Sequence, residues 1–146
     1  MPSRRWIAAA LVVLALGAAG CAGTPTADDR PVEPPAKVES ISGKDVKRVT
    51  LTERAHQRVG VETVEIATGA SGLVVPYAAV IYSADGGTWV FVETGSRSYA
   101  REKVVVENVG GDKGTEAYLS AGPPVGTKVV RTGVVELYGA ELGVGK

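Results

Sequence analysis

Few side chains in this sequence are of the types that perform covalent chemistry or hold a metal ion. The 146 residues contain one cysteine, Cys21, and one histidine, His56, and the only methionine is Met1. A zinc site needs three or four cysteine, histidine or carboxylate ligands, and a soft copper site needs several sulfur or imidazole ligands. A single cysteine also excludes a disulfide within the chain. We therefore expect no metal centre and no cofactor.

Three other groups of residues could perform chemistry, and each has a simpler structural interpretation. His56 has no serine, cysteine or second histidine beside it, so a surface helix residue is favoured over a catalytic base. The glycine-rich segment 110–114 lacks the Lys-Ser/Thr pair of a phosphate loop, which favours a hairpin turn. Asp28, Asp29 and Glu33 could bind calcium, but in a proline-rich stretch they are expected to be solvated. We therefore predict that the protein is not an enzyme.

The beginning of the chain predicts export. Arg4 and Arg5 precede an uninterrupted apolar run over residues 6–20, as in a secretory signal peptide. A membrane-spanning helix needs about 20 apolar residues, so a retained membrane anchor is the weaker alternative. The net charge of the whole chain is zero, which argues against nucleic acid as a partner.

Small residues stand directly before the only cysteine, in the segment 16–20. The segment resembles the lipobox of bacterial lipoproteins, in which the cysteine is lipidated and becomes the first mature residue. It departs from that pattern at Ala18, where leucine is usual. The resemblance implies a signal peptide over residues 1–20 and a lipid on Cys21, which would hold the protein on the outer face of the cytoplasmic membrane. Ordinary signal-peptidase cleavage near an unmodified Cys21 is the alternative.

The segment that follows, residues 21–45, is predicted to be a lipid-anchored disordered tether. Its first part carries four prolines and almost no large apolar residue, so it cannot bury enough surface to become ordered. A flexible segment of this length spans on the order of 25 Å, so we expect the folded part to work close to the membrane.

From residue 46 onward the pattern predicts a mainly β fold, a small twisted antiparallel sheet or barrel of about six or seven strands with one short helix. Thr52 is expected to cap the helix, which would run through Val59 and end at Gly60. Short runs rich in β-branched residues alternate with glycine-containing turns, which is typical of antiparallel strands. The expected strands cover residues 46–51, 61–66, 73–82, 88–93, 98–108, 115–119 and 127–132, with a loop at 67–72 and a hairpin loop at 83–87.

Several of these runs, taken in order, resemble a known family. They are residues 75–80 (VPYAAV), 87–92 (GTWVFV), 104–106 (VVV), 120–122 (SAG), 126–130 (GTKVV) and 136–141 (ELYGAE). The set looks like the membrane-proximal domain of the periplasmic adaptor subunits of RND efflux pumps, the membrane fusion proteins. Residues 51–64 resemble the lead-in that precedes it in those adaptors. The resemblance implies a lead-in of strand, helix and strand over residues 46–72 and an adaptor-like β domain over residues 73–146.

The chain departs from that family in what lies between the two pieces. Full-length adaptors carry a lipoyl-like domain, usually a helical hairpin, and a β-barrel at this point. Here residues 67–72 alone separate the two pieces, and six residues extend at most about 20 Å. The methionine ligands of copper-exporting adaptors are also missing. The resemblance therefore implies a shortened, non-catalytic, adaptor-like lipoprotein. Its implied partner is an efflux transporter of the cytoplasmic membrane. Assembly of several copies of the chain is implied only by analogy with the family.

Candidate partner contacts lie around the hairpin loop. Trp89 and Phe91 fall on one strand face with Tyr77 expected across from them, and Asp85 lies in the loop. Filling of the core is the simpler explanation of the aromatic residues, and a partner-binding patch at Tyr77, Asp85 and Trp89 is the alternative. Two other functions stay open: a free-standing envelope lipoprotein that binds a small ligand or a cell-wall component, and an inactive remnant.

Overall fold

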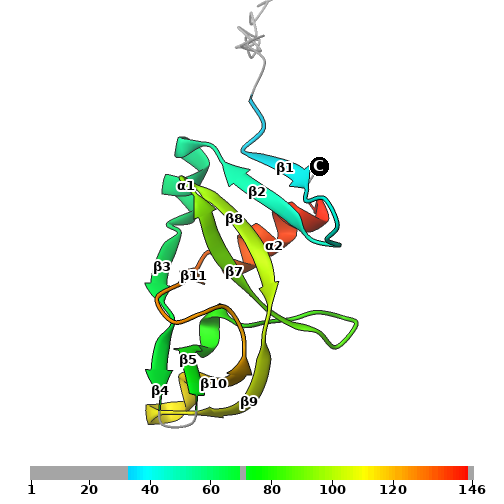
Figure 1. The fold of residues 1–146 in the computed structure, drawn as a ribbon. Helices are drawn as coiled ribbons and strands as arrows, with labels where there is room; N and C mark the ends of the chain where they lie inside the picture. Colours follow the sequence, from blue (N-terminus) through cyan, green and yellow to red (C-terminus); the bar gives the residue numbers. More distant parts are fainter. Residues whose placement is uncertain (1–32, 70–71, 145–146) are drawn as a thin grey trace, which may run out of the picture. The chain divides into compact units, whose positions relative to one another are not determined.

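The computed structural model describes residues 33–69 and 72–144, and within them the protein is mainly β. Eleven strands form two antiparallel sheets, and the two α-helices are short (Figure 1). The predicted fold class is confirmed. The strands are more numerous than predicted because two predicted strands each divide and because β1 and β4 were not predicted. The second helix was not predicted either.

The larger sheet has the order β1-β2-β8-β7-β11-β3, and β6 pairs with β7 beside this path. Its strands are β1 (Ala36–Ser40), β2 (Lys47–Leu51), β3 (Glu62–Glu65), β6 (Ile81–Tyr82), β7 (Thr88–Gly95), β8 (Ser98–Lys103) and β11 (Lys128–Thr132). Strands from both predicted segments, 46–72 and 73–146, belong to this sheet, since β2 pairs with β8 and β3 pairs with β11. The chain therefore does not separate at residue 72, and residues 33–144 fold as one unit.

The smaller sheet has the order β4-β5-β10-β9. Its strands are β4 (Ala67–Gly69), β5 (Gly72–Pro76), β9 (Val105–Gly110) and β10 (Glu116–Ala121), and the short 3-10 turns are η1 (Tyr77–Ala79) and η2 (Asp112–Gly114). The predicted loop at 67–72 is wrong in part, because β4 and β5 form a hairpin there. The predicted strand over residues 98–108 divides at the buried Val104, where the chain passes from the larger sheet to the smaller one.

Helix α1 (Glu53–Val59) confirms the predicted helix and both of its ends. The hydroxyl of Thr52 accepts a hydrogen bond from the backbone N–H of Ala55 at 3.2 Å, and Gly60 adopts the left-handed conformation with φ of 66°. A left-handed residue after the last turn is where glycine is favoured, so the end of the helix follows from local chemistry.

Helix α2 (Val134–Leu142) packs against the larger sheet through Val134 and Leu137. It begins after Gly133 and ends at Gly143, both with positive φ. No side-chain oxygen caps its start, and its first residues are two valines, which are typical of strands. The start of α2 therefore carries no helix signal in the sequence, and packing against the sheet decides the conformation there.

Strand β1 corrects the predicted tether. Residues 36–40 pair with β2, with Val38 opposite Val49, and Ala36 and Val38 pack against the buried residues under α2. Backbone hydrogen bonds to a neighbouring strand stabilise a segment that has too few apolar residues to fold alone. Residues 1–32, with the predicted signal peptide, the start of the tether and Cys21, lie outside the described residues.

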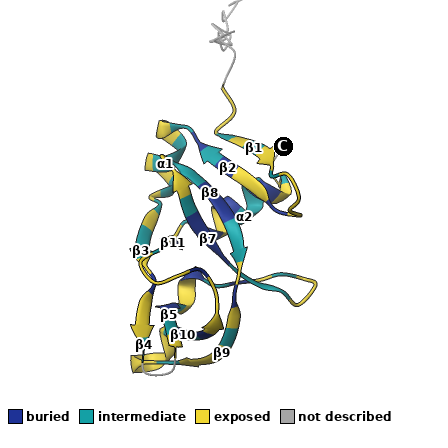
Figure 2. Ribbon diagram, viewed as in Figure 1, coloured by how far each residue is buried: buried dark blue, intermediate teal, exposed yellow. Residues whose placement is uncertain are grey.

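Two clusters of buried residues form the core, and the central strand β7 contributes side chains to both. Figure 2 shows the buried stretch of β7 between more exposed outer strands. The first cluster contains Ile66, Val75, Ala79, Val90, Val92, Val104, Ala117, Leu119 and Val129. The second cluster contains Val49, Leu51, Ile81, Phe91, Tyr99, Val130, Val134 and Leu137. Side chains alternate along a strand, so Val90 and Val92 enter one cluster while Phe91 enters the other. Neither described helix has the length and apolarity that a membrane span requires.

Candidate functional site

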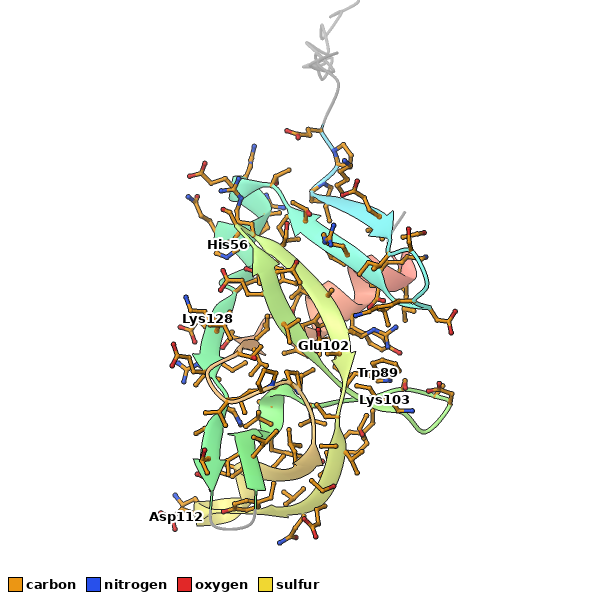
Figure 3. All side chains as sticks on the ribbon, viewed as in Figure 1. His56, Trp89, Glu102, Lys103, Asp112 and Lys128 are labelled. Carbon is orange, nitrogen blue, oxygen red and sulfur yellow. The ribbon has the colours of Figure 1, made fainter. Side chains whose placement is uncertain are left out.

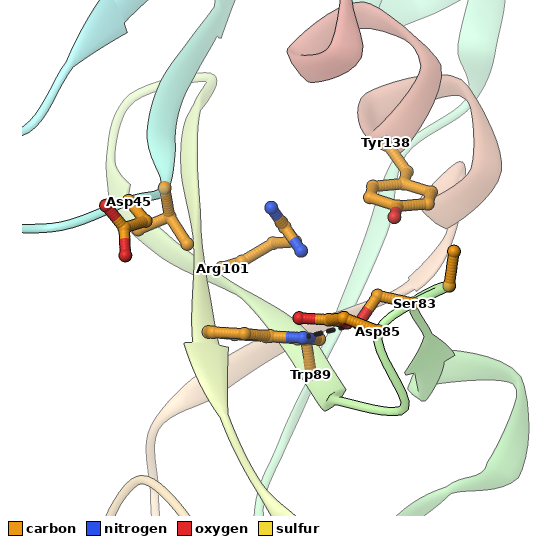
Figure 4. Close-up of a pocket in the computed structure, with 8 residues that line it drawn as sticks. Asp45, Ser83, Asp85, Trp89, Arg101 and Tyr138 are labelled. Carbon is orange, nitrogen blue, oxygen red and sulfur yellow. Dashed lines mark hydrogen bonds between the residues drawn. The ribbon is translucent and has the colours of Figure 1, made fainter.

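A pocket of about 360 Å³ lies at the hairpin that joins β6 and β7, and it contains two of the three predicted contact residues (Figure 4). Its lining residues come from the segment before β2, from the hairpin loop, from β7 and β8, and from α2. They are Asp45, Val46, Ser83, Ala84, Asp85, Trp89, Arg101 and Tyr138. We call this site the docking pocket. Figure 3 shows Trp89 and Lys103 at the base of the projecting hairpin.

Arg101 occupies the centre of the docking pocket. Its guanidinium carbon lies 4.9 Å from the centre of the Trp89 ring and 5.1 Å from that of Tyr138, so both rings make cation–π contacts with it. Its Nε and Nη2 donate to the two carboxylate oxygens of Glu141, whose side chain is only 3% exposed. Glu141 also accepts the backbone N–H of Lys47 at 3.0 Å. These contacts hold the guanidinium in one position.

The hairpin loop holds Asp85 and Trp89 in place through Ser83. The hydroxyl of Ser83 donates to Oδ1 of Asp85 at 2.5 Å, and it accepts the indole N–H of Trp89 at 3.0 Å. The backbone N–H of Gly87 donates to the same carboxylate oxygen at 3.2 Å. The hydrogen bonds from Ser83 and then Gly87 lower the pKa of Asp85 from its usual 3.8. Asp85 is therefore ionised at neutral pH, and the indole plane has a defined orientation.

The charges of the docking pocket do not balance. Glu141 neutralises Arg101, which leaves the carboxylates of Asp45 and Asp85 in the lining. Lys103 is close enough to lower the pKa of Asp85 further, although it contributes less than the hydrogen bonds do. The arrangement offers aromatic faces and carboxylate oxygens, which suit a basic or hydrogen-bond-donating group. Within the described residues, no group of three or more histidine, cysteine, aspartate or glutamate side chains could hold a metal ion.

Tyr77 lies away from the docking pocket, which corrects its expected place across from Trp89. It belongs to η1 and contacts Tyr82, with ring centres 6.3 Å apart. In the hairpin, Ile81 is opposite Trp89 and Tyr82 is opposite Thr88. Neighbouring side chains of a strand point to opposite faces, so Tyr82 and its contact Tyr77 lie across the ribbon from Trp89. Tyr77 and Tyr82 are 42% and 54% exposed.

The other residues considered in the sequence analysis do not line the docking pocket. His56 stacks on Tyr99, with its Nε2 3.1 Å from the phenol oxygen, and burial is the main cause that raises the pKa of Tyr99. The segment 110–114 is the turn between β9 and β10, as predicted. Phe91 is fully buried, which confirms core filling there. Glu33 is exposed, and Asp28 and Asp29 lie outside the described residues.

Sequence reasoning missed Arg101, Tyr138 and Asp45 as parts of the site. Arg101 is followed in its strand by two further charged residues, Glu102 and Lys103, and nothing local distinguishes it from a solvated arginine. Its environment arises because β8 pairs with β7 and α2 packs beside both, which are contacts between residues far apart in the chain. The Ser-Ala-Asp-Gly-Gly loop was the one local signal, since such residues form turns through side-chain hydrogen bonds.

The chain was also compared with protein-family models, with curated proteins and with solved structures. None of the three comparisons found a match.

Proposed function

We propose that the protein is a lipid-anchored, non-catalytic, adaptor-like subunit that docks onto an efflux transporter of the cytoplasmic membrane. The observation that carries this proposal is the docking pocket, in which Trp89 and Asp85 are held in fixed positions beside Arg101 and Tyr138. Tryptophan, tyrosine and arginine are the residue types that contribute most to protein–protein binding. Because they are held before binding, little conformational entropy is lost when a partner docks.

The fold supports the resemblance to pump adaptors at one further point. The two pieces that resemble an adaptor's lead-in and its membrane-proximal domain share one sheet, because β2 and β3 pair with β8 and β11. In full-length adaptors the additional domains lie between these two pieces of the sequence. The corresponding place in this chain is the hairpin of β4 and β5, where Gly69 is opposite Gly72. An insertion at the tip of a hairpin leaves the remaining strand pairing intact. The shortened chain is therefore consistent with a membrane-proximal module without those domains.

The test is recovery of the transporter with the full-length tagged protein from gently solubilised membranes. We expect the wild type to recover a transporter subunit, identified by mass spectrometry, and Trp89→Ala to lower the recovery at least tenfold, since a hot-spot residue contributes about 2 kcal/mol or more. Tyr82→Ala, which removes an exposed aromatic ring on the other face of the hairpin, is the matched control and should keep recovery unchanged. Repeated absence of any transporter subunit would contradict the proposed function.

The anchor is tested separately by metabolic labelling with a fatty acid. The wild type should incorporate the label, and Cys21→Ala should not. Label in the Cys21→Ala protein would show that the anchor is elsewhere.

A second function is favoured by the size of the pocket. Its volume of about 360 Å³ lies in the range of small-molecule sites, which supports a free-standing envelope lipoprotein that binds a small ligand or a cell-wall fragment. A ligand that binds the folded state raises the melting temperature by mass action. A thermal-shift series with purified cell-wall fragments separates the two functions, because a docking subunit would gain no stability from them.

A further inference from the structure

The outward face of α2 is apolar and uncovered within the described residues. Val135 is 79% exposed and Leu142 is 57% exposed, and Val144, just after the helix, is 74% exposed. Val135, Gly139 and Leu142 are spaced by four and three residues, so they lie along one side of the helix. The face is therefore a stripe with two large apolar side chains and a glycine between them. We call it the α2 stripe.

The fold does not require glycine at position 139. A Cβ atom placed there would meet nothing within 4 Å, and the residue is in ordinary helical conformation. Glycine inside a helix is less favourable than alanine, because it loses more backbone freedom on folding. A glycine at this position therefore lowers stability without a reason inside the described part of the protein.

The end of the helix also lacks a contact that its geometry usually provides. The N–H of Val144 donates to the carbonyl of Gly139 at 2.9 Å, and the N–H of Gly143 donates to that of Ala140. In this motif the residue at the position of Val144 commonly packs on the side chain at the position of Gly139. Gly139 has no side chain to provide this contact, and Val144 is 74% exposed.

We propose that the α2 stripe receives an α-helix of the partner, which crosses α2 at Gly139. The inference rests on the proposed function and specifies the partner's contacting element. A residue without a side chain at the crossing point lets two helix backbones approach closely, while Val135 and Leu142 pack on either side of the contact. The exposed Glu136 beside the stripe favours a partner helix that carries a basic side chain at its edge.

The α2 stripe is continuous with the docking pocket. Tyr138, which lines the pocket, is three residues after Val135 and four before Leu142, so it borders both on the helix surface. A partner helix on the stripe would thus reach the pocket edge at Tyr138, and a basic side chain there would face Asp85 and Asp45.

A helix fits the stripe better than a bilayer does. A face that inserts into lipid gains from a large apolar side chain at its centre, and Gly139 provides none. The charged residue beside the stripe is Glu136, which anionic lipid repels.

The first experiment places a leucine at the proposed crossing point of the full-length, membrane-bound protein. Gly139→Leu should fold normally and melt at the same or a slightly higher temperature, because leucine is the better helix former and has free space there. It should lower recovery of the transporter at least tenfold, and Gly139→Ala should lower it less. Ala121→Leu, at an exposed position of β10, is the control and should recover the transporter as the wild type does.

The second experiment identifies what covers the stripe, with a photo-crosslinking residue at Val135 and, as control, at the exposed Val109. We expect the Val135 crosslink to map to a helical segment of the transporter and the Val109 crosslink to be absent there. A crosslink to phospholipid, to a second copy or to a non-helical segment, or none at all, overturns the inference. If the wild type and Gly139→Leu recover the transporter equally, the inference about the α2 stripe is overturned while the proposed function stands. If the wild type recovers no transporter, both the inference and the proposed function are overturned.

Discussion

Arg101 and Glu141, forty residues apart in the chain, form a two-bond ion pair that joins β8 to α2. Their side chains are 11% and 3% exposed, so little water would solvate either charge if its partner were removed. The same carboxylate accepts the N–H of Lys47, so β2 is tied to the pair as well. The pair therefore fixes α2, which carries the α2 stripe, beside β8, which contributes Arg101 to the docking pocket.

Removing one partner of this pair should lower stability strongly. Arg101→Ala leaves the Glu141 carboxylate buried without its cation, and breaking a buried pair in this way costs about 3–5 kcal/mol. Urea denaturation of the two proteins gives the change in the free energy of unfolding. Arg131→Ala is the matched control, because Arg131 and Glu62 are 52% and 55% exposed and such pairs contribute less than about 1 kcal/mol. A loss for Arg101→Ala no larger than that of the control would contradict the structural role of the pair.

The cap of α1 should contribute measurably to stability. Thr52→Ala removes the oxygen that accepts the N–H of Ala55, and loss of such a cap costs about 1 kcal/mol. Thermal or urea unfolding measures the difference. Thr68→Ala, at an exposed position of β4, should change the free energy of unfolding by less than about 0.5 kcal/mol. Equal effects of the two substitutions would mean that the cap does not stabilise α1.

The hairpin loop should show a carboxyl group that titrates below its usual range. The structure lowers the pKa of Asp85 from 3.8, first through the hydrogen bond from Ser83 and then through that from Gly87. A lowered pKa stabilises the folded state above the unfolded value, and this contribution is lost as the pH falls through the folded value. NMR titration should give a midpoint below 3.8 for the wild type, and Ser83→Ala should raise it. A wild-type midpoint at or above 3.8 would contradict the hydrogen bonds of the loop.

Strand β1 should stabilise the fold through one of its two faces. Val38 packs against the cluster under α2, whereas the neighbouring side chain of Lys37 is 71% exposed. Val38→Ser should lower the free energy of unfolding by about 1–2 kcal/mol, because it removes apolar contacts of a partly buried side chain. Lys37→Ser should change it by less than about 0.5 kcal/mol. If residues 36–40 were a disordered tether, the two substitutions would be equally neutral.

Local chemistry explains which elements were predictable. The limits of α1 follow from Thr52 and Gly60, and the β6–β7 hairpin follows from the glycine-containing loop between two apolar runs. The division of the strand at Val104 was not predictable. Its burial depends on contacts with both sheets, and a continuous run of β-branched residues contains no sign of the change of sheet.

The candidate site was predictable to a smaller extent than the fold. Asp85 and Trp89 stand out locally, as a turn residue and an aromatic residue near the surface. Tyr77 was predicted on the same face. The register pairs Tyr82 with Thr88, so Tyr82 and its contact Tyr77 lie on the other side of the ribbon. A shift of one residue in register reverses the face of every side chain, and register is a property of two strands together.

The sequence by itself determined the mainly β class, the first helix with its two ends, the hairpin turns and the scarcity of residues for metal or covalent chemistry. These depend on residues within a few positions of one another. The tertiary structure decided that residues 36–40 form a strand, that residues 134–142 form a helix, and that Arg101, Tyr138 and Asp45 meet Asp85 and Trp89. Strand pairing and helix packing join residues tens of positions apart, and the energy of each contact exists only when both partners are in place.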